Sequence, residues 1–241
     1  MKRVILPLLF LATSVQAKTL VVAVIDTGVD KSVSHLCKMG HRDFVKTVVP
    51  FASGDPLVDV HGHGTHIAGL IAQNAGSGDY CIVSLRYYRA QANDNLLSMK
   101  EALKYAIAIK ADVINISAGG NDPDLEEKAL IKRALDQHIT VVTAAGNDHN
   151  NLDVSCRYYP ACYDKREVVV GNLEITYDSG KYRARIADTS NYGSPINRWE
   201  VGTNCLSNLP GGGKGRMSGT SQAAAVATGK IVKSKLSSRR H

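Results

Sequence analysis

The sequence predicts an α/β fold with a mainly parallel central sheet and helices on both faces. Short, unbroken apolar runs recur along the chain, which is typical of strands that are buried on both sides in a parallel sheet. Segments with apolar residues at helical spacing lie between these runs. Strands that alternate with helices join through right-handed crossovers, and these place helices on both faces of the sheet.

Five runs are expected to form strands. In chain order they cover residues 20–25, 81–85 (CIVSL), 112–117 (DVINIS), 139–146 (ITVVTAAG) and 167–173 (EVVVGNL). Helices are expected over 95–110 and 122–138. In the second of these, Asp122 is a candidate N-cap, and Pro123 would lie in the first turn.

Three predicted strands end in polar or glycine-rich residues. Asp26 follows the first apolar run, residues 117–120 follow the third, and Gly146 and Asn147 follow the fourth. Ligands of open α/β sheets gather at the carboxyl ends of the strands. The sequence therefore predicts a site where these three strand ends meet.

Residues 1–17 have the pattern of an export signal. Lys2 and Arg3 precede the apolar stretch VILPLLFLATSV, and small residues at 15 and 17 suit cleavage after Ala17. An uncleaved anchor is the alternative, but this stretch is too short to span a bilayer. We expect a secreted protein, extracellular or periplasmic, with no membrane anchor and a single domain over residues 18–241.

The chain carries a formal net charge of +7, part of it in the C-terminal segment KIVKSKLSSRRH. A basic surface can attract nucleic acid or anionic lipid. No nucleic-acid motif accompanies the charge, so we expect a solvated basic face and no nucleic-acid partner.

The five cysteines, at 37, 81, 156, 162 and 205, are expected to oxidise in an exported chain. Cys156 and Cys162 could close a short loop, and Cys37 and Cys81 would then form the next pair. Cys205 would be free or paired between molecules. Spacing alone does not fix the connectivity. A zinc site is disfavoured because the sequence has no C-x-x-C.

Asp26 lies in VVAVIDTGVD, and two protease chemistries use such a D-T-G. An aspartic protease needs a second carboxylate from another D-T-G or from a homodimer, whereas a serine protease uses the aspartate to orient a histidine. The sequence has no second D-T-G, and the chain is long for one subunit of a homodimeric aspartic protease. The serine protease interpretation is therefore preferred.

Two further motifs support the serine protease interpretation. His63 lies in DVHGHGTHIAGLIA, before an apolar helical run, and Ser221 lies in GRMSGTSQAAAVATG, before a helix of small residues. D-T-G, H-G-T-H-x-A-G and G-T-S-x-A in this order resemble the subtilisin-like serine protease family. The resemblance runs from about Val21 to about Gly229, with DVINISAGG and TAAGND at fitting intervals.

The resemblance implies a role for each motif residue. Ser221 would be the nucleophile, His63 the general base and then acid, and Asp26 the residue that orients His63. Asn147 matches the amide that donates to the oxyanion, with the backbone N–H of Ser221 as second donor. The simpler interpretation is that Asn147 only forms a turn. No organic cofactor is implied.

The resemblance also implies a substrate site. Ser117, Ala118 and Gly119 match the family's strand that pairs with an extended protein or peptide substrate, although a plain strand-to-turn transition is the simpler reading. Tyr158 stands where relatives often have glycine, at the floor of the first side-chain pocket. A bulky floor would favour small side chains before the cleaved bond.

The histidines at 61, 63 and 66 form H-x-H-x-x-H, which could suggest a metal site. No cluster of acidic or cysteine ligands accompanies them, so no metal is expected. The family places its base at the first histidine of H-G-T-H, which is His63. His66 is expected to be packed or hydrogen-bonded within a helix, and His61 to be a loop residue.

The chain departs from the family in four ways. Asp26 follows Ala17 by only nine residues, which leaves no room for a prodomain, so we expect either that the chain folds unaided or that a separate protein acts as chaperone and inhibitor. The connection QNAGSGDY is short, so a calcium site found there in relatives is expected to be absent, and a Cys37–Cys81 disulfide could replace it. Ala225 occupies the place of a structural proline, and the C-terminus is short.

The sequence therefore predicts a secreted serine endopeptidase that uses an Asp/His/Ser triad. The alternative is an exported, catalytically silent subtilisin-fold protein that binds peptides. A lipase-like hydrolase is disfavoured because Ser221 is not in G-x-S-x-G. The natural substrate, the oligomeric state and the activity of the isolated chain stay open.

Overall fold

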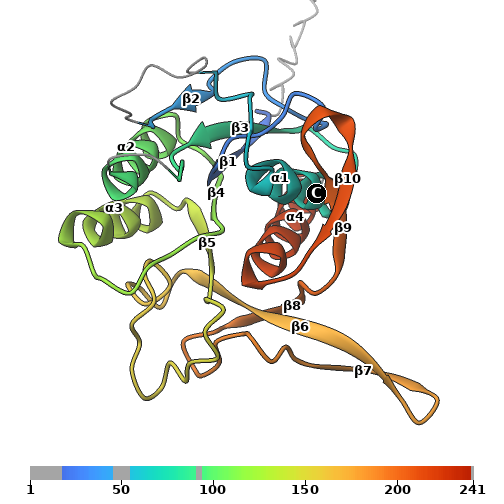
Figure 1. The fold of residues 1–241 in the computed structure, drawn as a ribbon. Helices are drawn as coiled ribbons and strands as arrows, with labels where there is room; N and C mark the ends of the chain where they lie inside the picture. The colour runs from blue at the N-terminus through green and yellow to red at the C-terminus, as the bar shows by residue number, and fades with distance from the viewer. Residues whose placement is uncertain (1–17, 46–54, 91–93, 240–241) are drawn as a thin grey trace, which may run out of the picture.

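The computed structural model describes residues 18–45, 55–90 and 94–239 (Figure 1). The predicted signal segment, 1–17, lies outside these residues. The strands are β1 (Leu20–Asp26), β2 (Arg42–Asp43), β3 (Tyr80–Arg86), β4 (Val113–Ile116), β5 (Thr140–Ala144), β6 (Val168–Asp178), β7 (Lys181–Ile186), β8 (Arg198–Val201), β9 (Cys205–Asn208) and β10 (Lys214–Met217). The helices are α1 (His63–Ala75), α2 (Asn95–Ala108), α3 (Leu125–Asp136) and α4 (Thr220–Ser238).

The central sheet has the order β2-β3-β1-β4-β5-β6-β7, and β8 also pairs with β6. Every pairing from β2 to β6 is parallel, as is β6 with β8, while β7 runs antiparallel to β6. The mainly parallel sheet is therefore confirmed, and each of the five predicted runs forms a strand. The β6–β7 and β9–β10 hairpins were not predicted.

Helices cover both faces of the sheet, as the sequence predicts (Figure 1). Successive side chains of β1 point to opposite faces, so Val22 and Val24 join the core beneath α1 and α4, whereas Ala23 and Ile25 join the core beneath α2 and α3. This double burial explains why the strands are continuous apolar runs.

One predicted helix start is wrong. Helix α3 begins at Leu125, and its N-cap is Asp124, not Asp122. The Asp124 carboxylate accepts a hydrogen bond from the backbone N–H of Glu127 at 2.7 Å, which satisfies one of the free donors of the first turn. Pro123 consequently precedes the cap and lies outside the helix.

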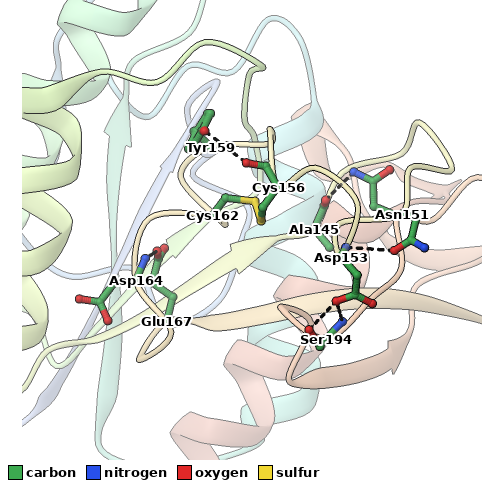
Figure 2. The surroundings of a disulfide bond; sticks show 10 residues. Ala145, Asn151, Asp153, Cys156, Tyr159, Cys162, Asp164, Glu167 and Ser194 are labelled. Atoms are coloured by element: carbon green, nitrogen blue, oxygen red, sulfur yellow. Dashed lines mark hydrogen bonds between the residues drawn. A yellow bond between two sulfur atoms is a disulfide. The ribbon is translucent and has the colours of Figure 1, made fainter.

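Two disulfides are present, in one of the pairings that the spacing allowed. Cys37–Cys81 joins the loop before β2 to strand β3, across 44 positions of sequence. Cys156–Cys162 closes a short loop next to the contact between Asp153 and Ser194 (Figure 2). Cys205 is the free cysteine among the described residues.

Within the described ranges, every helix is too short or too polar to cross a membrane.

Candidate functional site

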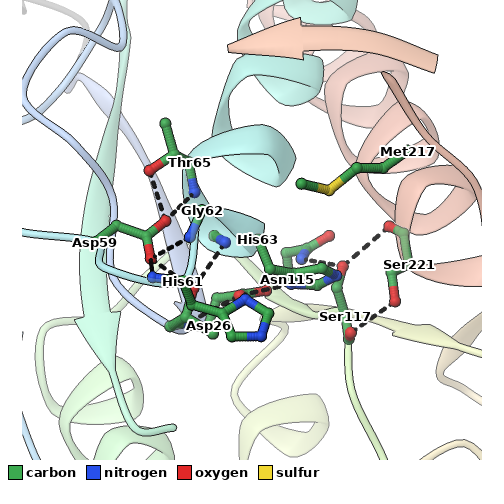
Figure 3. A network of polar contacts seen from close by, with 12 residues as sticks. Asp26, Asp59, His61, Gly62, His63, Thr65, Asn115, Ser117, Met217 and Ser221 are labelled. Carbon is green, nitrogen blue, oxygen red and sulfur yellow. Dashed lines mark hydrogen bonds and ion pairs between the residues drawn. The ribbon is translucent and has the colours of Figure 1, made fainter. Parts of the chain in front are cut away.

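The predicted site residues come together at the carboxyl edge of the sheet. Asp26 ends β1, Ser117 follows β4, and Asn147 lies just beyond β5. Strands β1, β4 and β5 are neighbours, so their ends meet at one edge. His63 and Ser221 reach the same edge from the first turns of α1 and α4 (Figure 3).

His63 and Asp26 form a hydrogen-bonded pair. Nδ1 of His63 lies 2.7 Å from Oδ1 of Asp26, and the same oxygen accepts from the backbone N–H of Thr27 at 2.8 Å. The Asp26 side chain is 3% exposed, against 24% for His63. Burial lowers the pKa of His63, but the charge and hydrogen bond of Asp26 outweigh this, with help from Asp59, and the net pKa is raised.

Asp59, which is not among the site residues predicted from the sequence, fixes the start of α1. Its carboxylate accepts hydrogen bonds from the backbone N–H groups of residues 61, 62 and 65 and from the hydroxyls of Thr27 and Thr65. Asp59 is 3% exposed. A carboxylate four residues before His63 in D-V-H-G-H was the available signal, because Asp readily caps nearby backbone donors.

Gly64 allows α1 to approach β1 closely. A Cβ at this position would lie 2.0 Å from the carbonyl oxygen of Gly28 and 3.0 Å from Cβ of Asp26. The helix start is also tied to the strand end, because the N–H of Gly64 donates to the Thr27 hydroxyl at 2.9 Å. The glycine after His63 is therefore required by packing.

Ser221 makes a reciprocal pair with Ser117. Its Oγ donates to the Ser117 carbonyl oxygen at 2.8 Å, and Oγ of Ser117 donates to the Ser221 carbonyl oxygen at 3.1 Å (Figure 3). In this arrangement the Ser221 hydroxyl is bonded to the strand end and not to His63.

A buried polar chain supports this pair. The Asn115 amide donates to Oγ of Ser117 at 2.9 Å, and its oxygen accepts from the Thr228 hydroxyl of α4 at 2.8 Å. Asn115 and Thr228 are fully buried. A single polar residue inside the apolar run DVINIS was the signal that could have identified Asn115, since buried amides require partners.

Asn147 is oriented by the start of α4. Its Oδ1 accepts from the backbone N–H of Thr220 at 2.9 Å and from the Thr220 hydroxyl at 3.1 Å. Asn147 is exposed. With Oδ1 engaged by Thr220, the residue before Ser221, the Nδ2 donor of Asn147 has no partner among the described residues.

The segment after β4 has an open backbone edge. Gly120 pairs with Tyr159 through two backbone hydrogen bonds of 2.9 and 2.8 Å. Ala118 and Gly119 make no backbone hydrogen bonds with the described residues. Their free N–H and C=O groups suit the addition of an extended strand.

Tyr158 packs between two backbone segments of the site. A Cβ at Gly119 would lie 2.6 Å from the Tyr158 ring, and one at Gly146 would lie 2.9 Å from it. Burial raises the pKa of Tyr158 to about 12, with a smaller contribution from the Asp148 charge, so the phenol is neutral. The ring thus occupies space between the Gly119 and Gly146 segments.

Gly119 and Gly120 line a pocket of about 300 Å³. It is mainly apolar and is lined by residues of α2, the strand end and the following loops, among them Tyr87, Tyr88, Leu96, Met99 and Tyr159. Glu127 is the buried carboxyl in its wall, and burial raises its pKa, although the Tyr163 hydroxyl donates to it.

The other two histidines do not join a metal site with His63. His66 is fully buried, and its Nε2 lies 3.0 Å and 3.2 Å from the carbonyl oxygens of Cys205 and Gly215, as expected for a packed helix residue. His61 is a loop residue whose ring contacts Tyr88 edge-on. Across the described ranges, no group of three or more His, Cys, Asp or Glu residues is placed to hold a metal ion.

The chain is similar to known serine proteases of one family. The sequence pattern of the subtilase family, peptidase S8, matches residues 17–237. The major intracellular serine protease of Bacillus subtilis (strain 168) is 32% identical over 235 residues, which cover 92% of this chain and 70% of that protein. Subtilisin NAT of Bacillus subtilis subsp. natto is 33% identical over 209 residues, which cover 84% of this chain and 51% of that protein.

Solved structures show the same fold. A lanthipeptide protease superposes with a TM-score of 0.73, and a cold-adapted subtilisin-like serine proteinase with 0.68. Each is 24% identical, and each alignment covers 92% of this chain and 75% of the other. With the family match over nearly the whole chain and the strand-end geometry of Asp26, His63 and Ser221, the chain belongs to the subtilase family of subtilisin-like serine peptidases.

Proposed function

We propose that the chain is a secreted serine endopeptidase whose nucleophile is Ser221. The observation that carries the proposal is the 2.7 Å contact between Asp26 and His63 at the edge where Ser221 and Asn147 also lie. A serine hydroxyl is a poor nucleophile until a neighbouring base takes its proton. An aspartate-bound histidine supplies that base.

The reaction follows from these positions. As Oγ of Ser221 bonds to the scissile carbonyl carbon, Nε2 of His63 takes its proton, and the negative charge of Asp26 stabilises the imidazolium. Nδ2 of Asn147 and the N–H of Ser221 donate to the oxyanion. His63 then protonates the leaving amine as the C–N bond breaks, which leaves an ester on Ser221. Water attacks the ester carbonyl carbon while His63 takes its proton, and the ester bond breaks as His63 returns that proton to Oγ of Ser221.

The substrate would add a strand to Ser117, Ala118 and Gly119, whose open backbone edge supports this. The residue before the cleaved bond would face Tyr158, so we propose a preference for small side chains there. The pocket beyond Gly119 has room for a side chain further upstream in the same extended peptide.

Export is part of the proposal. Two disulfides support it, because such bonds persist in oxidising compartments. The similarity to an intracellular protease of Bacillus subtilis points the other way. Cell fractionation with N-terminal sequencing tests it: periplasmic or extracellular protein that begins at Lys18 supports export, whereas cytoplasmic protein that retains Met1 contradicts it. We also propose that a separate protein acts as chaperone or inhibitor of this chain.

A silent peptide-binding protein is the second candidate. The observation that favours it is the Ser221 hydroxyl, which bonds to Ser117 and not to His63. Labelling of purified protein with a fluorophosphonate, read by intact mass beside Ser221→Ala, separates the two. One adduct on wild type and none on the variant supports the enzyme, whereas folded wild type that stays unlabelled, with or without other exported proteins added, supports the binding protein.

A further inference from the structure

The β6–β7 hairpin extends away from the body of the molecule (Figure 1). In its outer part the pairs Leu173–Ile186, Ile175–Ala184 and Tyr177–Tyr182 lie directly across from one another. Side chains of a strand alternate between faces, so these six residues share one face, which we call the hairpin face. The Tyr177 and Tyr182 rings confirm this, with centroids 5.0 Å apart.

The opposite face of the hairpin is polar. It carries the pairs Glu174–Arg185, Thr176–Arg183 and Asp178–Lys181. Arg185 forms ion pairs with Glu174 and with Asp188. One apolar face and one charged face is the pattern of a sheet that packs on a core with one side and meets water with the other.

No described part of the chain supplies that core. Tyr177 is 66% exposed and Tyr182 is 79% exposed, while Ile175 and Ile186 are also exposed. The two tyrosines alone leave on the order of 300 Å² open to water, because a tyrosine carries about 150–250 Å². With the isoleucines, the hairpin face reaches the size of the largest apolar patches on monomeric proteins, about 300–600 Å².

We propose that the hairpin face is covered by the hairpin face of a second copy of this chain, in a twofold dimer. Two amphipathic ribbons that stack their apolar faces form a small sandwich and leave both charged faces in water. An apolar face is complementary to itself, as a twofold interface requires. The patch also supplies roughly half of the 800 Å² or so per partner that a standard interface buries.

The charges favour a second copy over an anionic membrane. Lys181 and Arg183 lie on the face opposite to Tyr177 and Tyr182, so a hairpin that inserted its tyrosines would direct these cations away from the lipid headgroups. Strands β4, β5 and β6 also separate β7 from β1, so dimerisation leaves Asp26 in place. The dimer is thus independent of the proposed activity.

The test is the molar mass in solution. Light scattering and sedimentation of Ser221→Ala protein, which cannot digest itself, are expected to show a monomer that becomes a dimer as concentration rises. Tyr177→Thr with Tyr182→Thr keeps strand-forming residues and is expected to be monomeric at every concentration. Arg183→Thr, on the same strand but the opposite face, is expected to dimerise like the parent.

Circular dichroism melting shows whether each variant is folded, and the single change Tyr182→Lys replaces the double variant if that one does not fold. A parent that is monomeric throughout, or a folded Tyr182→Lys protein that still dimerises, overturns the proposal. Vesicle flotation tests the alternative that the hairpin face binds lipid. Tyrosine-dependent binding to vesicles by a parent that does not dimerise assigns the hairpin face to lipid and overturns the dimer.

Discussion

Ser221 and Ser117 hold each other through two hydrogen bonds of opposite direction, hydroxyl to carbonyl at 2.8 Å and 3.1 Å. The carbonyl that accepts from Ser221 belongs to the segment proposed to bind substrate. An N–H of an extended substrate that bonded to this carbonyl would compete with the Ser221 hydroxyl. Substrate binding would therefore release the hydroxyl toward His63.

Thr228→Val is expected to lower kcat on the order of tenfold and to change KM much less. It breaks the chain from Thr228 through Asn115 to Ser117, which positions Ser221, and small misplacements at reacting atoms cost up to about 10²-fold. Thr228→Ser keeps the hydroxyl and is expected to retain activity. Steady-state kinetics of both variants make the check, and equal kcat values for the two would contradict the positioning role.

Activity is expected to rise with pH through the pKa of His63, which is raised above its ordinary value, because only neutral His63 accepts the Ser221 proton. Asp26→Asn removes the charge that raises this pKa and leaves the burial that lowers it. The rising limb of the plot of kcat/KM against pH is then expected at lower pH. The rate itself is expected to fall on the order of 10⁴-fold. A limb that stays at the wild-type pH would show that Asp26 does not control His63.

The same shift affects stability. Since the folded-state pKa of His63 is raised, its contribution to the free energy of unfolding is full below the unfolded pKa of about 6.5 and is lost as pH rises through the folded value. The site is therefore expected to be most active above the pKa of folded His63, where the contribution of His63 to stability has been lost.

Tyr158→Gly is expected to raise kcat/KM for peptides with phenylalanine before the cleaved bond, relative to alanine, by about 10-fold or more. The change removes the ring that packs against Gly119 and Gly146. Tyr159→Phe, which deletes a neighbouring hydroxyl but keeps its ring, is the control. Wild-type protein that already prefers large aromatic side chains in a peptide panel would refute the pocket assignment.

Asp59→Ala is expected to lower the free energy of unfolding by at least about 2 kcal/mol, because it strands several buried donors that cost about 1–3 kcal/mol each. It should also lower activity, since α1 carries His63 on its first turn. The matched change Asp55→Ala removes an exposed aspartate that also accepts a backbone N–H, from Leu57. Urea unfolding of both variants gives the comparison, and equal losses would argue against the role of Asp59.

Ionisation of Glu167 is expected to lower the stability of the protein as pH rises from about 5 to about 8. Burial raises its pKa to about 8, and its Oε2 is buried without a hydrogen-bond partner among the described residues. Its contribution is full below the unfolded pKa and is lost as pH rises to about 8, a change on the order of a few kcal/mol. Glu167→Gln cannot ionise, so the difference between its unfolding curve and that of wild type should grow from pH 5 to pH 8. A constant difference would exclude ionisation of Glu167.

The sequence predicted the sheet and the residues at its carboxyl edge because both depend on local patterns. Asp26, Ser117 and Asn147 each follow an apolar run, so parallel pairing was enough to bring them together. Asn115 was missed because Thr228, which donates to its oxygen, lies on a helix that only folding brings near. Asp59 was missed although most of its partners are local, because the position of a loop carboxylate does not show which backbone donors it will face. The β6–β7 hairpin was missed because its outer half alternates polar and apolar residues, whereas the predicted strands are continuous apolar runs.

The Cys37–Cys81 bond closes a loop that contains both Asp59 and His63. In the chain-entropy model, closing a loop of this length stabilises the folded state by about 4 kcal/mol, because it restricts the unfolded chain over the segment that carries the proposed base. Reduction would remove this restriction and so lower the free energy of unfolding of the whole fold that holds His63 and Ser221 at one edge. The folded site is therefore expected to persist longer in an oxidising compartment than in a reducing one.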